Sequence, residues 1–171
     1  MTASTAAISL AGAAVAIAIV WANLRPWLAG GRDPKALAPY GAGAALGSLA
    51  TICVGGALGW GANGIAGAAT AGGNKGVSKT AGTGPSGLPT GRMGTLTPEG
   101  GVVVCLILVA VVLLFKAAGK KEKRRILGGF VSFAILGFLP GVAATLTWWP
   151  DAVNWAGAEL AGILSSSGSF L

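Results

Sequence analysis

Long runs without a charged side chain constrain this sequence more than any other feature. The most apolar run is VVVCLILVAVVLLF, residues 102–115, and others cover residues 6–21, 39–72 and 126–148. Only 10% of all residues are charged, whereas about a quarter are charged in a typical soluble domain. Because so few ionic side chains cannot cover a water-facing surface, most of the surface is expected to face lipid. The sequence predicts an all-α, polytopic membrane protein with about four transmembrane helices.

The first two predicted spans differ in composition. Residues 1–38 contain the first transmembrane helix, Ala6–Trp21, followed by a basic loop. No basic residue precedes Arg25, so this helix is interpreted as an uncleaved anchor, with a signal peptide and a longer pilin-type leader as the alternatives. Residues 39–72 form a Gly/Ala-rich span. This span is predicted to be helical because in lipid a lone segment can pair its backbone groups only as a helix.

The remaining segments alternate between polar and apolar composition. Residues 73–101 are rich in Gly, Ser, Thr and Pro and are predicted to form a flexible exposed loop. Residues 102–147 are predicted to form a transmembrane hairpin, with a basic turn at 116–125 and a kink at Pro140. Residues 148–171 form a Trp-rich tail that is expected to lie on the membrane or on a neighbouring subunit. The predicted interfacial aromatic residues are Trp21, Trp27, Trp148 and Trp149.

The twelve basic residues predict an orientation in the membrane. Three lie between the first two spans, three in the long loop and six in the basic turn, namely Lys116, Lys120, Lys121, Lys123, Arg124 and Arg125. With both termini outside the cell, nine of the twelve fall in cytoplasmic loops, as the positive-inside rule favours. The basic turn is therefore expected to be cytoplasmic and attracted to anionic lipid. Contact with nucleic acid, whose phosphates bind the same residue types, is the less favoured reading.

Small or polar residues recur at every fourth position in the Gly/Ala-rich span. This ladder consists of Gly43, Gly47, Thr51, Gly55, Gly59, Asn63 and Gly67. On one helix these residues would share a face that another helix can approach closely, and Asn63 could add an interhelical hydrogen bond. The partner helix could belong to the same chain or to a second copy. So many small-residue surfaces favour self-assembly into a homo-oligomer.

The sequence contains no constellation typical of an enzyme. It has no histidine, and its five acidic residues are scattered. Residues 59–64 match the dinucleotide fingerprint GxGxxG, but no acidic residue follows before Pro98 to hold a ribose. Cys53 and Cys105 lie in apolar runs and are predicted to be small buried residues. We therefore predict no catalytic residues, no cofactor and no metal site.

Residues 98–147 resemble the hydrophobic hairpin of conjugative, type IV secretion pilins. The resemblance is carried by GGVVVCLILVAVVLLFKAAGKKEKRRILGGFVSFAILG, two apolar stretches joined by a short basic turn with glycine just after it. It implies a membrane-stored subunit that polymerises into a tube, with Lys120, Lys121, Lys123, Arg124 and Arg125 in the turn.

The resulting hypothesis is a non-enzymatic integral membrane protein that self-assembles through small-residue helix packing. It would be a small subunit of a conjugative transfer or secretion assembly, with other membrane subunits as further partners. A holin-like pore former is the alternative, and a small transporter component is the third reading. The transporter is disfavoured because no Asp, Glu, Lys or Arg is expected in mid-membrane, where proton or ion relays usually need an ionisable residue.

Overall fold

The computed structural model describes residues 8–53, 55–82 and 86–167, and this part of the chain is almost entirely helical. Its helices are α1 (Leu10–Ala29), α2 (Pro34–Ile52), α3 (Gly56–Ala81), α4 (Pro98–Ala117), α5 (Lys120–Leu136), α6 (Pro140–Thr145) and α7 (Trp148–Ser167). Two short strands, β1 (Ile8–Ser9) and β2 (Gly87–Leu88), pair antiparallel. The all-α prediction is confirmed.

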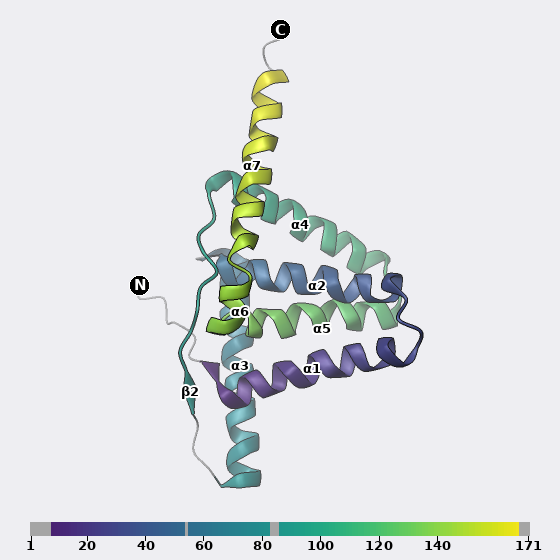
Figure 1. Ribbon diagram of the computed structural model, residues 1–171, viewed down its shortest axis with the longest axis vertical. Coiled ribbons are helices and arrows are strands. Elements are labelled where there is room, and N and C mark those ends of the chain that lie inside the picture. Colours follow the sequence, from purple (N-terminus) through teal and green to yellow (C-terminus); the bar gives the residue numbers. More distant parts are fainter. Residues whose placement is uncertain (1–7, 54, 83–85, 168–171) are drawn as a thin grey trace.

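Four of the helices run between the same two ends of the molecule. Figure 1 shows α2 and α5 side by side at the centre and running in the same direction, with α1 and α4 on either side running in the opposite direction. Helices α3 and α7 run crosswise at the end where α2 and α5 finish, and they extend away from the bundle in opposite directions. This end is termed the crossed end below.

Two of these helices, α1 and α4, are each long and apolar enough to cross a membrane. A third candidate span exists if α2 and α3, which are bent by 101° relative to each other, are counted together. These assignments rest on length and composition alone. The structure therefore contains apolar helices long enough to span a membrane. By length and composition there are two or three such spans among the described residues, not the four that were predicted.

The predicted Gly/Ala-rich span, residues 39–72, is not one helix. The chain turns between α2 and α3, where Gly55 and Gly56 have φ angles of 107° and 67°. Glycine adopts such angles readily because it has no Cβ. Helix α3 then continues to Ala81, into the segment predicted as a flexible loop. Later in that segment, Met93 is only 4% exposed and packs in an apolar cluster with Leu49, Ile52 and Val104. The segment 73–101 is therefore not an exposed loop along its whole length.

The second helix of the predicted hairpin is also divided. Helix α5 ends at Leu136, and Pro140 begins the short helix α6. Proline has no backbone N–H to donate and its ring clashes with the preceding turn, so it is favoured in the first turn of a helix and destabilises a helix interior. Most of the predicted Trp-rich tail is the regular helix α7.

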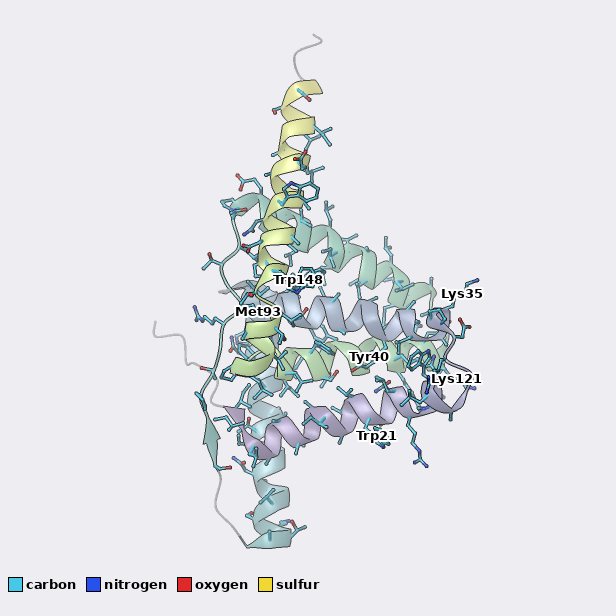
Figure 2. The ribbon with its side chains drawn as sticks, viewed as in Figure 1. Trp21, Lys35, Tyr40, Met93, Lys121 and Trp148 are labelled. Carbon is cyan, nitrogen blue, oxygen red and sulfur yellow. The ribbon has the colours of Figure 1, made fainter. Side chains whose placement is uncertain are left out.

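The central helices α2 and α5 meet in what we term the central seam, which consists of Tyr40, Gly43, Gly47, Gly129 and Ser132. Gly43 lies against the carbonyl of Ile126, and Gly129 lies against the carbonyl of Tyr40. The Tyr40 and Ser132 hydroxyls form a buried hydrogen bond of 3.0 Å across the seam; Figure 2 labels Tyr40. The two backbones can approach closely because no side chain separates them.

The second half of the chain repeats the architecture of the first. Each half has a long apolar helix, a connection, a central helix and a crosswise helix: α1, α2 and α3 in the first half, and α4, α5 and α6–α7 in the second. In Figure 1, α1 and α4 flank the central pair on opposite sides and α3 and α7 point in opposite directions, as a half-turn about an axis between α2 and α5 would relate them. The relation is approximate, because α3 also packs on α2 and α5 more extensively than α7 does. The chain therefore has internal pseudo-twofold symmetry.

Matching hydrogen bonds support this symmetry at the level of atoms. Ser9 and Thr97 cap α1 and α4, each accepting a bond from the backbone N–H three residues later. Each also donates its own backbone N–H to the crosswise helix of its half, Ser9 to Thr70 Oγ1 at 3.4 Å and Thr97 to Asn154 Oδ1 at 2.9 Å. Two independent contacts thus recur in both halves.

Glycines allow the same crossing in each half. A Cβ on Gly73 of α3 would lie 2.8 Å from the backbone of Ala11, and one on Gly157 of α7 would lie 2.5 Å from the backbone of Glu99. Both distances are too short for a side chain, so only glycine allows these helices to cross so closely. Gly73 and Gly157 are therefore equivalent positions of the repeat.

Candidate functional site at the basic end

The basic residues gather at the end of the bundle opposite the crossed end. Nine of the twelve lie in or beside the α1–α2 and α4–α5 connections: Arg25, Arg32, Lys35, Lys116, Lys120, Lys121, Lys123, Arg124 and Arg125. We term this group the basic end, and Figure 2 shows Lys35 and Lys121 together there. With two acidic residues, Asp33 and Glu122, its net charge equals the +7 of the whole chain, because three basic and three acidic residues cancel elsewhere.

Two connections that are far apart in the sequence form this surface together. The Arg125 guanidinium on α5 donates a hydrogen bond to the carbonyl of Ala36 at the start of α2. Within the first connection, Trp27 Nε1 donates to the carbonyl of Asp33 at 2.8 Å. The parallel packing of α2 on α5 places the starts of both helices at this end, so their basic residues combine into one patch.

Both acidic residues of the basic end accept hydrogen bonds from backbone N–H groups at helix N-termini. The Glu122 carboxylate accepts the backbone N–H of Gly119 at 2.9 Å, and the Asp33 carboxylate accepts that of Lys35 at 3.0 Å. Carboxylates are favourable at helix N-termini because they meet unpaired N–H groups and the positive end of the helix dipole. Their two negative charges are included in the net charge of +7, so the basic end remains strongly positive. The patch can attract phosphate-bearing partners such as anionic lipid or nucleic acid.

An apolar cavity of about 230 Å³ lies beside the α4–α5 connection. Only apolar side chains line it, among them Leu108 and Phe115 of α4 and Ile126 of α5. Lys123 Nζ lies 5.6 Å from the centre of the Phe115 ring, a cation–π geometry at the edge of the cavity. Helix α4 thus diverges from α5 beyond their connection, and the two are not a closely packed hairpin.

The cysteines line a second cavity, of about 250 Å³, between α4 and the α2–α3 turn. Cys53 is half-buried, whereas Cys105 is exposed on α4. The prediction that both are buried is therefore wrong for Cys105. Apolar character did not ensure burial here, because Cys105 lies on α4 near Val102, Leu106 and Val109, which are also exposed.

The first half of the glycine ladder packs within the molecule. Gly43, Gly47 and Thr51 lie on α2 and face α5. A Cβ at Gly43 or Gly47 would collide with backbone carbonyls of α5. The sequence left open whether these residues pack against a helix of the same chain or of a second copy. The structure shows that they pack against α5 of the same chain.

The second half of the ladder does not continue this face. Gly55 lies in the α2–α3 turn, and Gly59 lies close to the carbonyl of Cys53. The Asn63 amide donates to the carbonyl of Gly59 in its own helix at 2.8 Å, instead of to another helix of the described chain. Nothing lies within 4 Å of the position where a Cβ of Gly67 would be. The turn separates residues that the fourfold spacing had placed on one helix.

Of the four predicted interfacial tryptophans, Trp27 lies towards the basic end and Trp148 and Trp149 lie at the crossed end. Trp21 lies near the middle of α1, away from both ends. Trp21 is 61% exposed on α1, and Trp148 is 57% exposed at the start of α7; both are labelled in Figure 2. Trp27 and Trp149 are half-buried. The rings of Trp148 and Trp149 are 5.2 Å apart in an edge-to-face arrangement. The interfacial role remains a prediction.

Sequence reasoning missed the residues that fix the crossed helices, above all Thr70 and Asn154. A signal for them was present, because Ser9 and Thr97 each precede a long apolar run by the interval typical of an N-cap. Among the described residues, no group of three or more His, Cys, Asp or Glu side chains is placed to hold a metal ion. No protein-family model, curated protein or solved structure matches this chain.

Proposed function

We propose that this protein is a non-enzymatic membrane subunit in which α1, α2, α4 and α5 cross the bilayer and the basic end lies in the cytoplasm. The observation that carries this proposal is the segregation of the whole net charge to one end of a helical bundle. Positively charged loops are retained on the cytoplasmic side, and each charge near anionic lipid contributes on the order of 1 kcal/mol. A single orientation therefore suits both connections.

The outer surface and the length of α2 support this arrangement. Ile17 of α1 is 59% exposed and Leu113 of α4 is 60% exposed, so the two flanking helices offer apolar side chains to lipid. The 19 residues of α2 extend over about 28 Å, close to the roughly 30 Å of a bilayer core. The charged first turns of α5 would lie among the headgroups, where lysine side chains can extend into water.

In this orientation the crosswise helices α3 and α7 lie along the outer membrane surface. The tryptophans of α7 suit the interface between headgroups and acyl chains. The charged residues of both helices, Lys75, Lys79, Asp151 and Glu159, would face water or headgroups. Both chain termini would then lie outside the cell.

We further propose that the protein self-assembles as a small subunit of a transfer or secretion apparatus. The similarity of residues 98–147 to the pilin hairpin supports this role, as does the exposed basic turn between α4 and α5. The central seam uses its glycines within the chain, so contacts between copies must use other surfaces. The exposed faces of α3, α4 and α7 are available for them.

The test is to purify the protein from membranes in mild detergent and to measure its mass by light scattering over a range of concentrations. We expect species larger than a monomer that grow with concentration, and monomers at every concentration would contradict self-assembly. In parallel, a potential-sensitive dye should report an intact membrane potential in expressing cells. Collapse of the potential would instead support the holin-like alternative.

A further inference from the structure

We infer that copies of this protein join through α3 of one copy and α7 of the next, with Lys75 of the first facing Glu159 of the second. This inference rests on the proposed self-assembly and specifies its contact. It starts from the internal symmetry: Lys75 follows Gly73 by two residues, and Glu159 follows the equivalent Gly157 by two. The two halves therefore carry opposite charges at equivalent positions.

Both charges lie on the outer face of their helices. Two residues correspond to about 200° of rotation, so Lys75 and Glu159 point away from the crossings that Gly73 and Gly157 make. Both side chains are exposed. They are thus free to meet a partner without any change in the fold.

The directions of the two helices define how neighbours would meet. In Figure 1, α3 and α7 extend from the bundle in opposite directions along the long axis of the molecule. A neighbour displaced along this axis would place its α7 antiparallel to α3. In an antiparallel pair, a residue that follows a given position on one helix lies opposite a residue that precedes the matching position on the other.

Placing Lys75 opposite Glu159 brings further complementary residues together. Four residues on, Lys79 comes opposite Trp155, which is 67% exposed and can accept a cation over its ring. Three residues back, Gly72 comes opposite Gly162, and nothing lies within 4 Å of a Cβ at either position. Small residues at this point let the two backbones approach. One register therefore satisfies charge, aromatic and steric complementarity.

The charge pattern favours this contact over its alternatives. Beyond its crossing with α1, α3 carries Lys75 and Lys79, whereas the charged residues of α7 are Asp151 and Glu159. Pairing α3 with α3 would bring lysines together, and pairing α7 with α7 would bring carboxylates together, and both cost free energy. The contact is therefore head to tail, and repeating it produces an open chain of copies instead of a closed dimer.

Charge reversal in the full-length protein tests this contact. We expect Lys75→Glu and Glu159→Lys, each alone, to require at least about tenfold more protein for assembly in detergent, because each variant places like charges together. The double variant should assemble like the unmodified protein. An equal mixture of the two single variants should also assemble, because every junction in an alternating chain then pairs opposite charges.

Asp151→Lys is the matched control, since it reverses an acidic residue of the same helix outside the proposed overlap. It should assemble normally. If the unmodified protein assembles while the single reversals have no effect, or the mixture fails to recover, the α3–α7 contact is wrong and self-assembly stands. If the unmodified protein remains monomeric, self-assembly itself is wrong. Circular dichroism of each variant should match that of the unmodified protein, as expected for exposed positions.

Discussion

At the residue scale, the glycines of the central seam are the positions least tolerant of a side chain. Gly43 lies against a carbonyl of α5, whereas nothing lies within 4 Å of a Cβ at Gly41 on the same helix. We expect Gly43→Val to lower the free energy of unfolding by about 2–3 kcal/mol through overpacking. Gly41→Val should change it by less than about 1 kcal/mol. Thermal unfolding in detergent measures both, and equal effects would contradict the seam.

The polar pair in the seam makes a smaller contribution. Tyr40→Phe removes the hydrogen bond to Ser132, whose hydroxyl keeps its bond to the carbonyl of Gly128 at 2.7 Å. Because Ser132 retains a partner, we expect a loss of about 0.5–1.5 kcal/mol. A double-mutant cycle with Ser132→Ala measures this coupling. A coupling energy of zero would show that the two hydroxyls do not interact.

At the element scale, the crossing of α4 and α7 depends on Asn154. Its amide accepts the backbone N–H of Thr97 and donates to the carbonyl of Thr95 at 3.0 Å. We expect Asn154→Ala to cost about 1–2 kcal/mol and to increase hydrogen exchange at the start of α4. Asn63→Ala is the control, because the Asn63 amide bonds only within α3. Similar exchange in both variants would contradict the role of Asn154.

The elements differ in how well the sequence could predict them. The apolar run 102–115 lies within α4, and most of the run 6–21 lies within α1, because runs this apolar and long favour a helix in lipid. The bounds of the first predicted helix were wrong: α1 begins at Leu10, after β1, and continues to Ala29 through part of the predicted basic loop. The α2–α3 turn was missed because Gly55 continues the fourfold spacing, and this spacing carries no information about the φ angles of Gly55 and Gly56. The charges in the sequence predicted the basic turn at the α4–α5 connection. They could not show that the α1–α2 connection lies beside it, because this depends on the packing of α2 on α5.

At the scale of the whole molecule, the internal symmetry was the feature most hidden from the sequence. The halves share the contact geometry but not the residues: Thr70 and Asn154 hold equivalent positions, as do Lys75 and Glu159. Such divergence keeps the fold and changes the outer faces of the crosswise helices. A symmetric architecture thereby acquires two unlike surfaces, as head-to-tail assembly requires.

The central claim, a bundle that crosses the membrane with the basic end in the cytoplasm, is tested most directly by labelling single cysteines in intact cells. In a background with Cys53→Ala and Cys105→Ala, the variants Lys121→Cys and Asp151→Cys place a thiol at the basic end and the crossed end. A membrane-impermeant maleimide is expected to label Asp151→Cys in intact cells, and Lys121→Cys only after permeabilisation. Labelling of Lys121→Cys in intact cells, or equal labelling of both, would contradict the orientation.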